Sequence, residues 1–168
     1  SEHSVSTVID GGAVVLAGAT DSNVYSFKLV SGAYVNKGQT KIPFEEIYSM
    51  AASEGIIFLG TKEVNTNIGR FYKAEVAVAD DLYVLGNRQL IKQWDVSGID
   101  TSPRAMFVSR DSVYVGIHES STECNLWRYY LPTTGLARDL VQTHSSNTTA
   151  KINTITQSNG KFVTILSG

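Results

Sequence analysis

Histidine residues are the first candidates for chemistry in this chain. The three histidines, His3, His118 and His144, stand in none of the spacings that bind a metal, such as H-x-H or H-E-x-x-H. His118 follows the apolar run Val113–Ile117 and precedes Glu119, so both side chains are expected at a strand end, where they could face a ligand. The alternative for His118 is a solvated loop histidine without a function.

Carboxylates are the second candidates, and they occur as the adjacent pairs Glu45-Glu46 and Asp80-Asp81. Neighbouring residues of a strand point to opposite faces, so neither pair forms a catalytic dyad by itself. Asp80-Asp81 lies between strand-like runs and is typical of a turn. The sequence contains neither a nucleophile elbow nor a phosphate-binding glycine loop. A cysteine-based zinc site is excluded because Cys124 is the one cysteine. We therefore predict no catalytic residue, no metal and no cofactor.

Aromatic side chains beside amides and arginine form the third candidate, since such groups stack on sugars or anchor protein partners. Arg88, Gln89, Gln93 and Trp94 make one such cluster, with Trp94 expected in an outer strand where it would be exposed. The alternative is that Trp94 packs along the outer edge. Together with His118 and Glu119, these are the predicted ligand or partner contacts.

The composition excludes several classes of partner. The chain has 168 residues, 18% of them charged, and a net charge of −2, with lysine and arginine scattered singly. Nucleic-acid binding is not expected, because it requires a basic surface. No stretch has the order of a signal peptide, and no apolar run approaches the roughly 20 residues of a membrane helix. We expect no membrane insertion, and the location is left open between a virion and the cytoplasm.

The elements that must position these residues are predicted to be β-strands. Short runs rich in Val, Ile, Tyr and Phe alternate with turn residues, and Asn23–Val30 alternates with a period of two. Phe44–Ala52 could form a short helix, but a strand over Ile47–Ala52 fits the repeat better. Most aromatic side chains in the inner strands are expected in the core: Tyr25, Phe27, Phe58, Tyr83, Tyr114, Trp127 and Tyr129.

The runs recur in order as units of four strands within one domain. The units span approximately residues 3–43, 47–98, 103–144 and 150–168, of which the fourth is incomplete and the second carries an extra run at Leu82–Leu85. Three segments align as strand, polar turn and strand: Ser49–Gly60, Ala105–Gly116 and Asn153–Thr164. Repeats of this length with four strands each are typical of propeller blades.

The chain therefore resembles β-propeller repeat proteins, without the motifs of a named subfamily. Trp94-Asp95 is similar to a WD pair but occurs once, and Gly11-Gly12 is the one kelch-like glycine pair. The resemblance implies an all-β fold of about three and a half four-stranded antiparallel blades, a partial ring completed by further blades in the same or another chain. We expect the sequence to be an excerpt. An irregular β-sandwich is the alternative.

The fold and the absence of catalytic motifs favour a non-catalytic binding or structural module whose partner is a protein or a glycan. The abundance of Ser, Thr, Asn and Gly is similar to that of β-rich proteins of tailed-phage virions, which implies a role in tail assembly or host-surface attachment. A glycan-acting hydrolase or lyase using His118, Glu119 and Glu123 is one alternative. An intracellular protein-interaction hub is the other.

Overall fold

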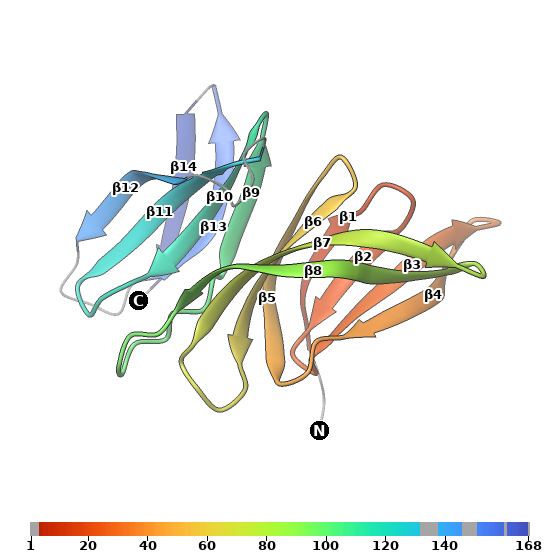
Figure 1. The fold of residues 1–168 in the computed structure, drawn as a ribbon. Helices are drawn as coiled ribbons and strands as arrows, with labels where there is room; N and C mark the ends of the chain where they lie inside the picture. Colours follow the sequence, from red (N-terminus) through yellow and green to blue (C-terminus); the bar gives the residue numbers. More distant parts are fainter. Residues whose placement is uncertain (1–3, 132–137, 146–150, 160, 168) are drawn as a thin grey trace.

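The computed structural model describes residues 4–131, 138–145, 151–159 and 161–167 (Figure 1). Its regular secondary structure within these residues consists of fourteen β-strands. Val, Ile, Tyr and Phe favour strands because their branched or aromatic side chains pack well on a pleated surface. The described part contains no helix with the length and apolar character needed to cross a membrane. The predicted all-β class is confirmed.

The strands form three four-stranded antiparallel sheets and one hairpin, each built from consecutive strands. Sheet 1 contains β1 (Val5–Asp10), β2 (Val15–Ala19), β3 (Asn23–Val30) and β4 (Ala33–Lys41). Sheet 2 contains β5 (Glu45–Ser53), β6 (Ile56–Glu63), β7 (Gly69–Ala79) and β8 (Leu82–Trp94). Sheet 3 contains β9 (Ala105–Ser109), β10 (Ser112–His118), β11 (Glu123–Tyr130) and β12 (Arg138–Ser145). Hairpin 4 contains β13 (Lys151–Ser158) and β14 (Lys161–Ser167).

Two features of sheet 2 settle questions that the sequence left open. The strand predicted at Ile47–Ala52 is confirmed within β5, and no helix forms there. The extra run Leu82–Leu85 is not a separate strand, because it continues into the predicted fourth strand as the single long β8. Asp80 and Asp81 both have positive φ and form the predicted turn, which folds β8 back along the full length of β7.

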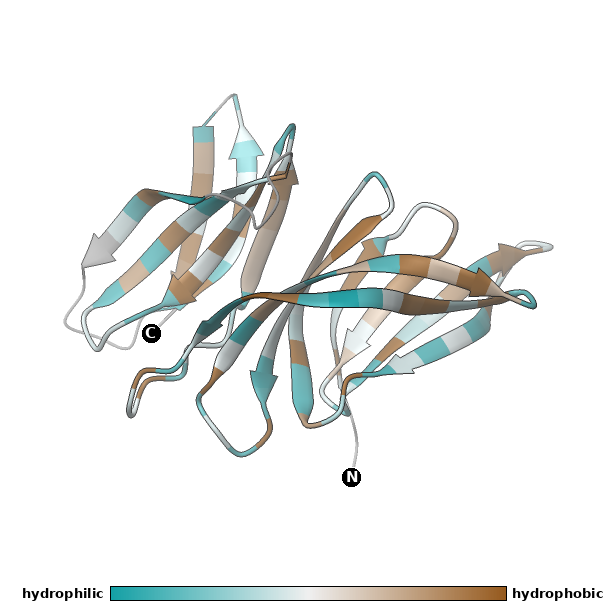
Figure 2. Ribbon diagram, viewed as in Figure 1, coloured by the Kyte–Doolittle hydropathy of each residue, from teal (hydrophilic) through white to brown (hydrophobic). Residues whose placement is uncertain are grey.

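The sheets stand side by side, so the first strands β1, β5, β9 and β13 contact one another in sequence. Each interface between sheets holds its own apolar cluster, and Figure 2 shows the apolar residues alternating along the strands. Strand β6, which begins at Ile56, and strand β10, which contains Val113, are each the second strand of their own sheet. The described residues therefore form separate sheets rather than the two facing sheets of a sandwich, and they close no ring.

A glycine in the second strand of each sheet sets the spacing to the next sheet. A Cβ atom added at Gly18 would lie 2.6 Å from Ile47 Cγ2, and one at Gly116 would lie 2.8 Å from Ile152 Cβ. At Gly60 it would lie 2.6 Å from the backbone oxygen of Pro103. Real Cβ atoms do not approach other heavy atoms so closely, so these three sites require glycine.

The fourth unit is shifted by one residue from the alignment that the sequence suggested. Thr154, and not Asn153, pairs with the residue at the glycine position, which is Ile165. The equivalent pairs are Ser49 with Gly60 and Ala105 with Gly116. The shift arises because Ile165 replaces the glycine in this unit, so the sequence offers no glycine that would fix the alignment.

The core face of sheet 1 also differs from the expectation. Val24 and Ser26 are buried against sheet 2, whereas Tyr25 and Phe27 lie on the opposite face and are half-buried. The period of two separates the two faces correctly, but it cannot say which face a neighbouring sheet covers. Phe58, Tyr83, Tyr114 and Tyr129 are buried as expected, and Trp127 is partly buried.

Replacing the spacing glycine tests this packing. Gly60→Ala is expected to lower the free energy of unfolding by about 1–3 kcal/mol, since the new methyl group meets the backbone of Pro103. Gly86→Ala is the matched control, because its Cβ atom would make an ordinary contact of 3.5 Å with Ala77. Urea denaturation followed by circular dichroism measures both. Equal stability of the two variants would contradict the packing role of Gly60.

Candidate functional site

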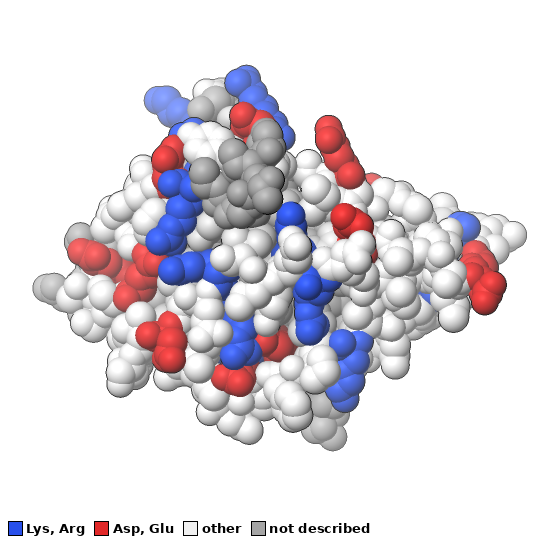
Figure 3. Space-filling view, viewed as in Figure 1, with Lys and Arg blue, Asp and Glu red and all other residues white. Residues whose placement is uncertain are grey.

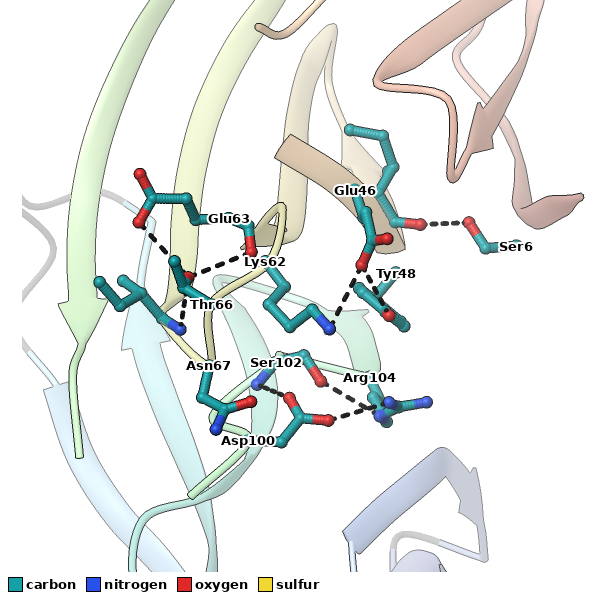
Figure 4. A network of polar contacts seen from close by, with 12 residues as sticks. Ser6, Glu46, Tyr48, Lys62, Glu63, Thr66, Asn67, Asp100, Ser102 and Arg104 are labelled. Carbon is teal, nitrogen blue, oxygen red and sulfur yellow. Dashed lines mark hydrogen bonds and ion pairs between the residues drawn. The ribbon is translucent and has the colours of Figure 1, made fainter. Parts of the chain in front are cut away.

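A polar cluster joins β5 and β6 to the segment between β8 and β9 (Figure 4), and Lys151 of β13 adds to it. Asp100 Oδ2 accepts hydrogen bonds from Lys151 Nζ at 2.5 Å and from an Arg104 guanidinium nitrogen at 3.1 Å. Its Oδ1 accepts the backbone N–H of Ser102 at 3.1 Å. Burial alone raises the pKa of Asp100, but these donors outweigh burial and hold that pKa well below its usual value.

Tyr48 forms the other half of this cluster. Its hydroxyl donates to Glu46 Oε2 at 3.0 Å, and Lys62 Nζ lies 3.3 Å from the same oxygen. The Arg104 guanidinium lies 4.6 Å from the centre of the Tyr48 ring, and Lys62 Nζ lies 5.5 Å from it. Cations over an aromatic face are stabilised by the ring quadrupole. Burial, followed by the hydrogen bond to Glu46, raises the pKa of Tyr48.

The repeat itself brings these residues together. Ser6, Tyr48 and Asn153 are the extra residues of bulges in β1, β5 and β13, and Arg104 takes the corresponding place directly before β9. Ser6 donates to the backbone oxygen of Ile47, so adjacent sheets are joined at this level (Figure 4). Sequence reasoning missed the cluster, although one signal exists: Tyr48 and Arg104 each lie twelve residues before a spacing glycine.

His118 is not the solvated histidine of the alternative interpretation, because its side chain is 4% exposed. Neither ring nitrogen has a hydrogen-bond partner of ordinary geometry among the described residues. Burial and the charge of Lys151 lower the pKa of His118, and Asp100 and the Ser120 backbone oppose that change. The imidazole is thus held neutral beside the Asp100 cluster, on the face of sheet 3 that packs against hairpin 4.

Glu119 lies in a different environment, although it is the next residue. Its Oε1 accepts Trp94 Nε1–H at 2.7 Å, and its Oε2 accepts Trp127 Nε1–H at 2.9 Å and the Asn125 side-chain amide at 2.5 Å. Trp94 is 4% exposed, which corrects the expectation of an exposed aromatic. The carboxylate therefore joins the end of β8 to β11, and sequence reasoning missed the part played by Trp127.

The predicted cluster at Arg88 does not hold together. Arg88 and Gln89 are exposed and line a groove of about 420 Å³ with Lys73 and Glu75. Gln93 lies elsewhere on β8 and accepts a hydrogen bond from Arg70 Nε at 2.9 Å. Trp94 is buried at the end of the strand. Figure 3 shows basic and acidic groups interspersed on the face drawn there.

Glu45, which sequence reasoning considered only as half of an adjacent pair, is a further buried carboxylate. Oε1 accepts from the Arg70 guanidinium at 2.5 Å and from the Tyr72 hydroxyl at 2.8 Å, and Oε2 accepts from Thr61 Oγ1 at 2.5 Å. Burial, then the hydrogen bond to Glu45, raises the pKa of Tyr72 to about 12. Spacing along one sequence could not reveal this group, because its members come from three strands.

These contacts determine what the polar groups can do chemically. Asp100, Glu119 and Glu45 each accept three hydrogen bonds from neighbouring donors, so their oxygens are occupied by structural contacts. Within the described ranges, no three His, Cys, Asp or Glu side chains come close enough to hold a metal ion. The arrangement is suited to joining sheets.

Comparisons with known proteins describe the fold alone. No protein-family model and no curated protein sequence matches this chain. Among solved structures, it is similar to the computationally designed Ika4 protein, with a TM-score of 0.55, 15% identity, and coverage of 98% of this chain and 89% of Ika4. The computationally designed Ika8 protein has a TM-score of 0.48 and 14% identity, with 95% of this chain and 54% of Ika8 covered. This chain thus spans about half the length of Ika8.

The Glu119 contacts generate a stability prediction. Glu119→Ala is expected to lower the free energy of unfolding by about 2–4 kcal/mol, because two indole N–H groups and an amide lose their acceptor. Glu119→Gln should cost less, since one carboxamide oxygen still accepts. Glu123→Ala, at an exposed position of β11, is the control and should change stability by less than about 0.5 kcal/mol. Thermal and urea unfolding would refute the role of Glu119 if all three variants matched wild type.

Asp100 generates a pH prediction. Its pKa is lower in the folded protein than the ordinary value of 3.8, so its contribution to stability is complete above pH 3.8 and is lost as the pH falls below it. Asp100→Asn should therefore be less stable than wild type by about 1.5–3 kcal/mol at pH 7, with a smaller difference below pH 3.8. Exposed Asp95→Asn is the control. A difference for Asp100→Asn that stays constant with pH would contradict the assignment.

Proposed function

We propose that this chain is a non-catalytic β-propeller-type module that binds a protein partner. The observation that carries the proposal is the apolar surface at the ends of the row of sheets. Val8 and Tyr34 of sheet 1 are exposed, as are Val163 and Ile165 of hairpin 4. Apolar side chains gathered on one sheet face are typical of a surface that another protein covers.

The propeller-type arrangement is supported by the order of the strands. The first strand of each sheet contacts the neighbouring sheets most extensively, so the first strands form a row. Within a sheet, each following strand lies further from this row. Radial blades are expected to have this arrangement: each unit has four consecutive antiparallel strands, and neighbouring units contact one another through their first strands. A further blade would cover the apolar face of sheet 1.

A protein partner fits this surface better than a glycan. Trp94, the aromatic side chain that could have stacked on a sugar, is buried against Glu119. The exposed face of sheet 1 carries aliphatic side chains at Val5, Val8 and Leu29 together with the ring of Tyr34. A mainly aliphatic surface is covered by apolar protein surface through the hydrophobic effect, whereas a sugar site combines aromatic faces with free polar groups. Assembly within a virion, as the composition suggests, is one setting for such a module.

The apolar surface can be tested with a fluorescent probe. The folded protein is expected to bind anilinonaphthalene sulfonate at the free face of sheet 1, and Val8→Arg should lower the fluorescence by at least about half because it places a charge there. Lys41→Arg, at an exposed position of β4, is the control and should leave the fluorescence unchanged. Circular dichroism would show that the sheets are intact. Equal fluorescence in all three proteins would contradict the proposal.

A hydrolysis assay distinguishes this proposal from an enzymatic one. Purified protein is incubated with a panel of polysaccharides, and new reducing ends are measured. No product is expected, because the strongest carboxylate candidate, Glu119, is bonded to three donors. Product that disappears in Glu119→Gln, under conditions where that variant stays folded, would replace the binding proposal by a glycan-acting enzyme.

A further inference from the structure

The free face of sheet 1 has the character of an inter-sheet interface. Val5, Val8, Leu29 and Tyr34 are between 58% and 63% exposed, and no described residue covers them. The half-buried side chain of Phe27 lines a shallow hollow of about 530 Å³ together with Val8 and Tyr34. The opposite face of sheet 1 is packed against sheet 2.

The repeat shows what happens at the same places when a sheet is covered. Ile47 and Met50 of β5 correspond to Val5 and Val8 of β1, since Thr7 and Ser49 take the same place beside the spacing glycine. Ile47 is 0% exposed and Met50 is 4% exposed, because sheet 1 lies over them. The free face therefore carries residues that the repeat elsewhere buries under another sheet.

At all three internal interfaces, the second strand of the covering sheet has the same three-residue pattern. It presents a large side chain, a residue facing the other way, and then the spacing glycine. The three examples are Leu16-Ala17-Gly18, Phe58-Leu59-Gly60 and Tyr114-Val115-Gly116. In each case the glycine receives the residue that corresponds to Val5 in the next sheet, so this large-x-Gly pattern is the complement of such a face.

Hairpin 4 breaks the pattern on its own exposed face. Its second strand reads Val163-Thr164-Ile165, and Ile165 stands where the other sheets have glycine. Ile165 is 56% exposed and points away from sheet 3, towards the place of a following sheet. A single Cβ atom at this position of the internal interfaces would already overlap the next first strand, so a whole isoleucine side chain cannot fit there at the same spacing.

We propose that the free face of sheet 1 binds a β-sheet whose second strand carries the large-x-Gly pattern, and that Ile165 prevents a second copy of this chain from taking that place. The proposal rests on the binding function proposed above and names its partner by structure. If two copies of this chain met head to tail, Ile165 would lie against Val5, and neither side would supply a glycine. Selectivity for the partner therefore depends on one residue.

The experiment makes the chain its own probe. Wild type is expected to sediment as a monomer, and Ile165→Gly is expected to self-associate with a dissociation constant at least about tenfold lower, because hairpin 4 then carries the complementary glycine. Val163→Gly is the matched control, since it removes another exposed side chain from the same face and strand. Adding Val8→Arg to Ile165→Gly should restore the monomer. Sedimentation velocity over a concentration series measures all four proteins.

A reciprocal variant keeps the test independent of how well hairpin 4 tolerates glycine. Val5 lies at the exposed start of β1. Val5→Gly removes the overlap between Val5 and Ile165 of another copy, so it should also raise self-association. The proposal fails if Ile165→Gly and Val5→Gly both stay monomeric, or if Val163→Gly associates equally well. Wild type that dimerises and becomes monomeric in Val8→Arg would instead make a second copy the partner. Sugar hydrolysis would overturn the proposed function without changing these association data.

Discussion

The contact between a glycine of one sheet and the first strand of the next is the constraint on which the rest of this structure depends. It occurs three times, at Gly18, Gly60 and Gly116, and each time it brings backbone against a neighbouring strand. Close approach lets the apolar side chains of both sheets interdigitate, which is the main source of stability when sheets pack face to face. The same approach brings the bulge residues of successive first strands within reach of one another.

The polar groups follow from this spacing. Asp100 joins Arg104 to Lys151 of β13, Glu119 joins Trp94 of sheet 2 to Trp127 of sheet 3, and Glu45 joins three strands of sheet 2. A half-buried or buried carboxylate is costly unless donors surround it, and here each has three. Groups that resemble catalytic candidates by type are thus used to fix how neighbouring sheets sit together.

The two ends of the row show the same constraint without a neighbour. Sheet 1 exposes Val5 and Val8 at places where sheet 2 buries Ile47 and Met50, and hairpin 4 carries Ile165 where the other sheets carry glycine. One end therefore has the surface of an unfilled interface, and the other has a side chain that blocks the internal spacing. In the binding module proposed above, this asymmetry would allow one kind of sheet to dock and would disfavour self-association.

The sequence by itself determined the strands, their grouping into units of four and the turn at Asp80-Asp81, because these depend on local residue preferences and on a period of two. Only the tertiary structure decided that Tyr25 and Phe27 lie on the uncovered face, that Trp94 is buried and donates to Glu119, and that His118 is buried beside the Asp100 cluster. The bulge at Asn153 and the continuity of β8 were also beyond the sequence pattern. The physical reason is common to all of these: an alternating strand has two faces, and the neighbouring sheet decides which of them is covered.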